Sequence, residues 1–414
     1  MTEPQAEPGL DRRSGTERRW ASQPAGGPEL APERRSIVRR AVDRLTEGRA
    51  RSGAIRASVG GRLGSLEAPH RRLEPGSRVL ERSAVAGYQA ASWLLQHLPA
   101  RPAWIVGGWL AQLAYRLWPK KRTWIDANFG HVLGLPADDV AVRKLALAAY
   151  RNYARYLVDL MRLPALPPEK VSLLVEPGGL ELMARVRRES KGLILIAAHI
   201  GNNEAVAAGI ASLGLPISVV ADDSAFPEMF ALLRRQREVW GIKLIPWRKL
   251  RDIYGVLRRQ EMLALLVDWG YRSDGIPVRL FDAWTCLPAG PAVLAAKTGA
   301  TILPIVVRRH PDGPMHVGAD DPIVVTSTGP LEVGRATQAV AAALERIVAA
   351  APDQWYSFKP IWPATAEESA ALAERPDAAG AHSFLNATGA SGRTALPPSG
   401  RATASSGEPA AAPS

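Results

Sequence analysis

Short apolar runs alternate with longer amphipathic stretches between residues 190 and 350. The runs have the length of buried strands, and in the stretches apolar positions recur at helical spacing. This alternation predicts an α/β fold with a mostly parallel central sheet flanked by helices, whose ligands bind beyond the carboxyl ends of the strands. The expected strands are 193–198, 217–220, 243–245, 262–267, 301–308 and 323–325, and the expected helices are 203–213, 227–240, 250–260, 292–297 and 334–350.

The segment before this region is helical and rich in aromatic residues. Apolar spacing predicts a long amphipathic helix over 139–163. Residues 84–118 are dense in Trp, Tyr and aliphatic residues and are interrupted by Pro99-Ala-Arg-Pro102. Each half is shorter than the about 20 apolar residues of a spanning helix. We therefore expect an N-terminal interfacial helical hairpin, with two helices packed on the core as the alternative.

The composition of the two ends differs from that of the middle. Residues 1–82 contain no lysine and are rich in Arg, Gly, Pro, Ser and Glu, while residues 364–414 are rich in Ala, Ser, Pro and Gly. Both ends are expected to be disordered, apart from a possible short helix over 366–374. The predicted organisation is therefore one functional domain, 83–363, which includes the membrane-associating helices 84–118, between disordered termini.

The charge of the chain limits its partners. The net charge is +12, and Lys120-Lys121-Arg122 lies between Trp118 and Trp124, a pattern that favours an anionic membrane surface. No nucleic-acid-binding fold is indicated, so no nucleic acid is expected as a partner. Cys286 is the only cysteine, no metal site is predicted, and no signal peptide is visible. We expect a peripheral or monotopic protein on the cytoplasmic face of the cell membrane.

Candidate chemistry lies where the run 192–198 ends at His199. Glu204 follows five positions later, in the expected first turn of a helix. A carboxylate on one ring nitrogen fixes the histidine tautomer, so that the other nitrogen can accept a proton from a hydroxyl. We hypothesise that Glu204 orients His199 as a general base. The alternative is a capping histidine beside a glutamate that suits a helix N-terminus.

Two further positions have a physical use. Asp268 ends the expected strand 262–267 and could orient the acceptor or the base, or else form a structural cap or salt bridge. Gly290, within Pro288-Ala-Gly-Pro291, permits a close backbone approach before a helix whose first amides could face an oxygen. A plain loop leading into a helix explains Gly290 equally well.

Four motifs in order carry a family resemblance. They are His199-Ile-Gly-Asn-Asn-Glu204, Leu287-Pro-Ala-Gly-Pro-Ala-Val-Leu294, Thr298-Gly-Ala-Thr-Ile-Leu-Pro304 and Trp355-Tyr-Ser-Phe-Lys-Pro-Ile-Trp-Pro363. From about Tyr88 to Pro363 the chain resembles the lipid A biosynthesis lauroyl/myristoyl acyltransferases, including the phosphatidylinositol mannoside acyltransferases, of the glycerolipid and lysophospholipid acyltransferase group. Asp268-Trp269-Gly270 departs from the Asp-Arg-Asp or Asp-Gln-Asp of the family.

The resemblance implies a function. The fold would be glycerolipid acyltransferase-like, and the enzyme would move an acyl group from acyl-CoA or acyl carrier protein (ACP) to a hydroxyl of a membrane glycolipid, without a further cofactor. Arg237 matches an arginine of the family and could bind a phosphate or stabilise an oxyanion, or else lie on a solvated helix face. The alternatives are a non-catalytic protein that binds anionic membranes and an acyltransferase that acts on a lysophospholipid.

Overall fold

A computed structural model describes residues 75–389, apart from 168–169, 172–173, 177–179, 213, 224–225 and 311–313. All of these residues belong to the compact unit Leu73–Ser414. The expected disordered segment 1–82 lies outside the described residues up to residue 74. Its end is helical, because the first described helix begins at Pro75.

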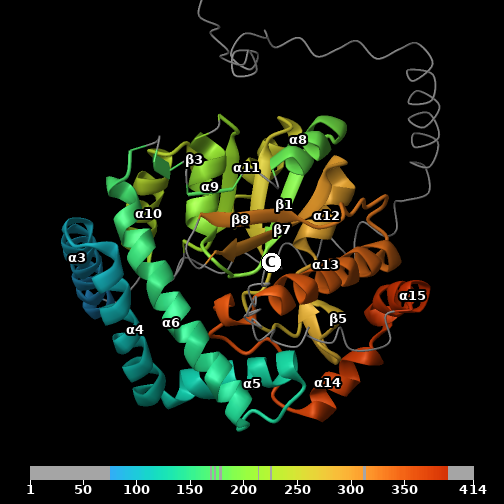
Figure 1. Ribbon diagram of the computed structural model, residues 1–414. Coiled ribbons are helices and arrows are strands. Elements are labelled where there is room, and N and C mark those ends of the chain that lie inside the picture. Colours follow the sequence, from blue (N-terminus) through green and yellow to red (C-terminus); the bar gives the residue numbers. More distant parts are fainter. Residues whose placement is uncertain are drawn as a thin grey trace, which may run out of the picture. The chain divides into compact units, whose positions relative to one another are not determined.

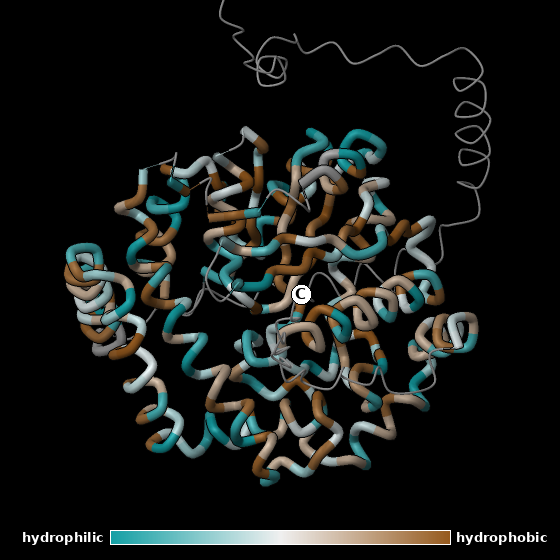
Figure 2. Tube along the Cα trace, viewed as in Figure 1, coloured by the Kyte–Doolittle hydropathy of each residue, from teal (hydrophilic) through white to brown (hydrophobic). Residues whose placement is uncertain are grey.

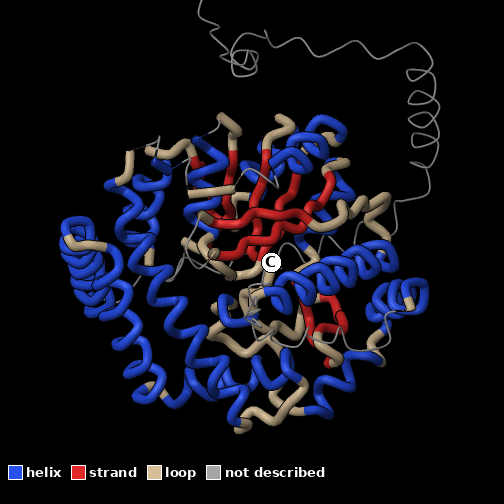
Figure 3. The backbone as a smooth tube through the Cα atoms, viewed as in Figure 1, coloured by secondary structure: helices blue, strands red, loops and turns tan. Residues whose placement is uncertain are grey.

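The centre of this unit is a six-stranded sheet with the strand order β3-β2-β4-β1-β7-β8 (Figures 1 and 3). Neighbouring strands from β3 to β7 are parallel, and β8 is antiparallel to β7. The prediction of a mostly parallel sheet is thereby confirmed. The strands are β1 (Leu193–Ala197), β2 (Ile217–Ala221), β3 (Ile242–Pro246), β4 (Met262–Leu266), β7 (Thr301–Arg309) and β8 (Met315–Ala319).

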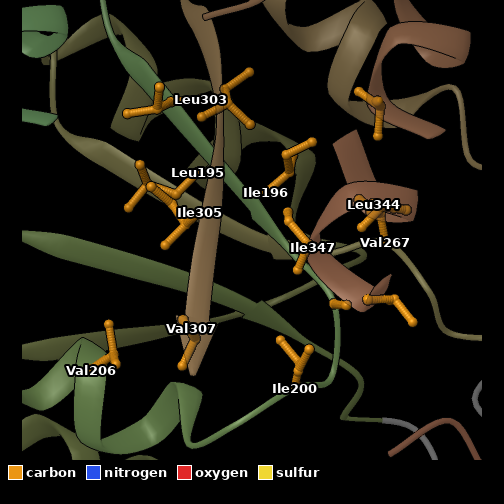
Figure 4. Packing of buried hydrophobic residues seen from close by; sticks show 14 of the residues in the cluster. Leu195, Ile196, Ile200, Val206, Val267, Leu303, Ile305, Val307, Leu344 and Ile347 are labelled. Carbon is orange, nitrogen blue, oxygen red and sulfur yellow. The ribbon is translucent and has the colours of Figure 1, made fainter. Parts of the chain in front are cut away.

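Helices cover the sheet, as the amphipathic stretches predict. They are α8 (Leu180–Glu189), α9 (Asn203–Ser212), α10 (Pro227–Glu238), α11 (Leu250–Arg258), α12 (Gly290–Thr298) and α13 (Pro330–Ala350). β1 is buried at every position because apolar layers lie on both of its faces. Figure 4 shows this packing, with Leu195 of β1 close to Leu303 and Ile305 of β7, and with Ile347 of α13 near Ile196.

Some strands differ from the expectation. The expected strand 323–325 is only an isolated bridge between Ile323 and Ile302. The sequence did not predict β8 or the separate hairpin of β5 (Ile276–Leu280) and β6 (Ala283–Leu287). Phe281 and Asp282 make the turn of this hairpin with positive φ angles of 47° and 60°. Tight hairpin turns normally carry glycine or asparagine at such positions, so the turn signal was absent.

The N-terminal helices pack against one long helix. They are α3 (Pro75–His97), α4 (Ala100–Leu117) and α5 (Pro119–Leu133), followed by the long α6 (Val140–Arg162). α4 lies along α6, and α3 packs on both α6 and α10. The break at Pro99 and the long helix agree with the prediction, and Asp139 caps α6 by accepting a hydrogen bond from the Ala141 amide. None of the described helices meets the length and hydropathy required to cross a bilayer.

The expected disorder of 364–414 is wrong for its first part. α14 (Ala366–Ala373) agrees with the possible short helix over 366–374. A short 3-10 turn η6 (Pro376–Ala378) and α15 (Ala379–Thr388) follow it, so the helical region extends beyond the expected one. α15 packs on α13 at Gly380, where a Cβ would lie 2.5 Å from the Arg335 amide nitrogen. The two helix backbones therefore meet closely, and residues 390–414 lie outside the described part of the chain.

Candidate functional site

His199 and Asp268 meet because of the register of two neighbouring strands. β1 and β4 are parallel, and Ala197 at the end of β1 pairs with Leu266 at the end of β4. The Val267 amide continues the ladder by donating to the Ala197 carbonyl at 3.2 Å. His199 and Asp268 each follow these paired residues by two positions. They consequently emerge side by side at the carboxyl edge of the sheet, where ligands bind in such folds.

The carboxylate of Asp268 fixes the histidine with both of its oxygens. Oδ1 lies 2.7 Å from Nδ1 of His199, and Oδ2 accepts from the His199 amide at 2.9 Å. Oδ2 also accepts from the indole nitrogen of Trp355 at 2.8 Å. Asp268 is 5% exposed, whereas the His199 side chain is 29% exposed. The imidazole is therefore held from the inside, and its Nε2 has no hydrogen-bond partner among the described residues.

The two groups shift each other's pKa in opposite directions. Burial alone would lower the pKa of His199, but the charge and the hydrogen bond of Asp268 outweigh it, so the pKa is raised above 6.5. Burial alone would raise the pKa of Asp268, but the charge of His199 and hydrogen bonds from His199 and Trp355 hold it below its ordinary value. The geometry thus favours an ionised carboxylate that stabilises an imidazolium.

Glu204 does not orient His199, so this part of the prediction is wrong. Glu204 lies in the first turn of α9, and its carboxylate accepts from Nε of Arg237 at 2.7 Å and from Nη2 at 2.5 Å. Arg237 lies on α10, and the two side chains are only 11% and 17% exposed. No hydrogen bond joins Glu204 to His199 within the described residues. Glu204 therefore acts on the imidazole only through its charge, a minor influence that raises the pKa.

The local sequence explains where Glu204 points. Asn202 caps α9 by accepting from the Ala205 amide at 3.0 Å, and Asn203 donates to the Ala198 carbonyl at 2.9 Å. The two asparagines fix the turn between β1 and α9. From this turn Glu204 reaches the guanidinium on α10, while His199 turns toward β4.

Gly290 lies at the first position of α12, where a Cβ would meet no atom within 4 Å. α12 leads into β7, which is parallel to β1, so its N-terminus lies at the same edge as His199. The structure shows no direct contact between Gly290 and the His199–Asp268 pair, and its role stays a prediction. The described residues also contain no cluster of three or more His, Cys, Asp or Glu arranged to hold a metal ion.

Sequence reasoning missed two residues around the pair. Trp355 donates to Asp268 from a segment 87 residues later in the chain, and Tyr356 donates its amide to the His199 carbonyl at 2.7 Å. The aromatic motif 355–363 was a usable signal, because it is one of the four motifs that carry the family resemblance. Trp269, next to Asp268, places its ring 5.6 Å from the His199 ring.

A parallel sheet with a histidine–aspartate pair at its carboxyl edge defines an α/β enzyme with the elements of general-base catalysis. The comparison with known families identifies which one, since residues 74–363 match the bacterial lipid A biosynthesis acyltransferases. The match covers well over half of the chain, which therefore belongs to this family and is an O-acyltransferase of lipid or glycolipid biosynthesis.

Curated relatives agree with this assignment. The phosphatidylinositol mannoside acyltransferase of Mycolicibacterium smegmatis is 27% identical over 282 residues, which are 67% of this chain and 90% of the relative. The protein of the same name from Mycobacterium tuberculosis strain H37Rv is 26% identical over 249 residues, which are 58% of this chain and 77% of the relative. The resemblance expected from the four motifs is thereby confirmed.

Proposed function

We propose that this acyltransferase transfers a fatty acyl group from an acyl-CoA or acyl-ACP thioester to a hydroxyl of a membrane glycolipid. His199 is the general base, and Asp268 is the residue that orients it, in place of the expected Glu204. The observation that carries the proposal is the contact of 2.7 Å between His199 Nδ1 and Asp268 Oδ1 at the carboxyl edge of the sheet. No cofactor beyond the thioester co-substrate is needed.

The reaction proceeds in one displacement. Nε2 of His199 takes the proton of the acceptor hydroxyl while its oxygen attacks the thioester carbonyl, because Asp268 keeps the other proton on Nδ1. The C–S bond then breaks, and the imidazolium returns the proton to the leaving thiolate. Asp268 stays ionised throughout, in agreement with its lowered pKa. No acyl-enzyme forms in this scheme.

Arg237 keeps its proposed role in binding a phosphate or the developing oxyanion, with a restriction. Two of its five N–H donors are bonded to Glu204, so that the two of Nη1 and the second one of Nη2 are left for a substrate. Glu204 thus acts as a positioning residue for Arg237. The glycolipid acceptor is proposed to be of the phosphatidylinositol mannoside type, because this is the substrate in the names of both curated relatives.

Membrane association is proposed from α4. A surface helix of a soluble protein turns its large apolar residues toward the core, whereas α4 turns them outward. Small residues face α6: a Cβ on Gly107 would lie 3.5 Å from Val158, and Ala111 is buried. Large apolar residues face outward, and Trp109 is 72% exposed. Figure 2 shows hydrophobic residues on the outward-lying α3 and α4. The exposed large residues of α4 are Ile105, Val106, Trp109, Leu110, Leu113 and Leu117.

A contiguous apolar face of this kind is typical of a helix that lies in the lipid interface. Basic residues follow it directly, among them Lys120, whose Nζ lies 5.1 Å from the ring centre of Trp124. The proposed partner is therefore an anionic membrane surface, contacted by α4 and the start of α5. The proposed location is therefore peripheral, on the cytoplasmic face of the cell membrane.

Replacement of His199 tests the proposal. The variant His199→Ala is expected to lose transfer from palmitoyl-CoA to phosphatidylinositol mannoside, measured as acylated glycolipid by mass spectrometry, and to keep the thermal unfolding temperature of the wild type. Full turnover by this folded variant would refute general-base catalysis by His199. Transfer to a lysophospholipid but not to a glycolipid would assign the enzyme to the lysophospholipid branch instead.

A further inference from the structure

Two loops build a small platform beside His199. The loop after β4 and the loop near the C-terminal motif are joined by a hydrogen bond of 2.7 Å from the Tyr271 amide to the Pro360 carbonyl. Gly270 has a φ of +130°, and a Cβ there would lie 3.3 Å and 3.4 Å from Cβ and Cδ of Lys359. The aliphatic part of the Lys359 side chain therefore packs directly on the backbone of Gly270, which has no side chain. A larger residue at this position would displace it.

The platform ends in an ammonium group that forms no salt bridge with any described residue. Nζ of Lys359 lies 3.5 Å from the ring centre of Trp269, and the same ring lies 5.6 Å from that of His199. Among the described residues no carboxylate oxygen lies within the 4 Å of a salt bridge from this nitrogen. Asp222, which follows β2, acts on it only as a more distant charge. The cation–π contact with Trp269 contributes about 0.5–2 kcal/mol, but it leaves the charge of the ammonium group without a counter-ion.

A second lysine lies near the platform that carries Lys359. Lys121 of α5 donates from Nζ to the carbonyl of Phe358 at 3.2 Å, one residue before Lys359. Lys121 likewise has no carboxylate within salt-bridge distance among the described residues. Burial first, and then the charge of Lys121, lower the pKa of Lys359. The two like charges therefore repel each other, and an anion bound between them would relieve this repulsion.

We infer that Lys359 and Lys121 bind a phosphate group of a substrate next to His199. The ring of Trp269 positions the ammonium group of Lys359 for this contact. Ammonium groups bind phosphate as point charges, and a half-buried pair binds more strongly than a solvated one. The inference rests on the proposed function, whose two substrates both offer this chemistry. CoA thioesters carry phosphates next to the pantetheine arm, and phosphatidylinositol mannosides carry a phosphodiester.

The test combines variants with substrates that have or lack the phosphate. Lys359→Gln and Lys121→Gln are compared with Lys297→Gln, which alters an exposed lysine in the last turn of α12, at the opposite end of the strands. The donors are palmitoyl-CoA and palmitoyl-pantetheine, and the acceptors are phosphatidylinositol mannoside and octyl mannoside. Loss of one charge-assisted contact is expected to raise the KM of the phosphate-bearing substrate about tenfold to hundredfold.

The pattern of losses identifies the source of the phosphate. A higher KM for palmitoyl-CoA but not for palmitoyl-pantetheine assigns the lysines to the donor. A higher KM for phosphatidylinositol mannoside but not for octyl mannoside, with either donor, assigns them to the acceptor. Either result supports the inference, and Lys359→Arg should restore most of the loss. An unchanged KM in all four combinations, or an equal loss in all four, would overturn it.

Failure of the proposed function is recognised separately, because wild-type enzyme would then transfer no acyl group to either acceptor. In that case calorimetric binding of CoA and of soluble dihexanoyl phosphatidylinositol decides the inference without turnover. Wild type and Lys297→Gln should bind one of these ligands at least tenfold more tightly than Lys359→Gln. Equal binding by all three proteins would contradict a phosphate site at Lys359.

Discussion

Asp268→Asn is the sharpest perturbation of the site, because it changes one atom and no volume. Oδ2 of Asp268 accepts two hydrogen bonds, from the His199 amide and from Trp355, whereas Oδ1 faces one imidazole nitrogen. The asparagine carbonyl must therefore take the place of Oδ2, and its NH₂ group must face Nδ1 of His199. A donor at that place forces Nδ1 to be an acceptor. The proton then resides on Nε2, which can no longer accept one from a hydroxyl.

The expected loss follows from this tautomer change. The same substitution in a carboxylate–histidine pair that activates a hydroxyl lowers kcat about 10⁴-fold. At about 1.36 kcal/mol for each factor of ten, the barrier rises by about 5.4 kcal/mol. The two hydrogen bonds onto the other oxygen survive in the variant, so the fold should be retained. The KM values should change little, because Asp268 is too buried to contact substrate.

The assay is steady-state transfer from palmitoyl-CoA to phosphatidylinositol mannoside, with thermal unfolding of each variant as a check. The matched control is Asp274→Asn, since Asp274 is 64% exposed and is paired with Arg272 only six residues further along the chain. This control should keep full activity. A kcat for Asp268→Asn within tenfold of the wild type, in a folded protein, would refute the orientation of His199 by Asp268.

Three further outcomes are expected. Glu204→Gln should lower the free energy of unfolding in urea by about 3 kcal/mol, because it leaves the 11% exposed Arg237 without its charge partner. It should lower kcat much less than Asp268→Asn does, and an unchanged stability with a 10⁴-fold loss of kcat would instead make Glu204 the partner of the base. The kcat/KM of the wild type should rise with pH with a midpoint above pH 6.5, because the pKa of His199 is raised and only the neutral imidazole accepts a proton. A midpoint below 6.5 in the pH–rate profile would contradict the raised pKa. Trp109→Glu should weaken binding to anionic vesicles, measured by co-sedimentation, roughly thirtyfold, since half of a tryptophan surface at about 25 cal/mol per Å² corresponds to about 2 kcal/mol. The control Leu331→Glu, at a 58% exposed position on α13, should bind as the wild type does, and equal binding by both variants would exclude α4 as the membrane face.

The sequence predicted the five parallel strands because most of them are apolar runs with few interruptions. The run 193–197 is buried throughout, because a strand that is apolar on both faces is stable only where helices or loops cover both faces of the sheet. The hairpin β5–β6 was missed because Phe281 and Asp282 turn without glycine. Of the helices after residue 364, α15 was missed because its segment was predicted to be disordered from its composition. Alanine is nevertheless the best helix former, and α15 packs on α13.

The site was predicted in its members but not in its pairing. His199 and Asp268 were both placed at carboxyl ends of strands, which depends only on local pattern. That β1 and β4 are neighbours depends on strand order, and two strands intervene between them in the chain. Glu204 is near His199 in sequence, yet the turn fixed by Asn202 directs it to Arg237. Sequence distance was therefore a poor guide to which carboxylate meets the imidazole.

The bond from Trp355 to Asp268 has a consequence for the newly made chain. The carboxylate that holds the imidazole needs a donor that the ribosome produces 87 residues later. Until the segment around Trp355 has emerged and docked, one lone pair of a buried anion lacks its partner, and the histidine is not firmly held. Under the proposed function, a nascent chain whose N-terminal helices are already exposed would therefore reach the bilayer before its site is able to act on a thioester.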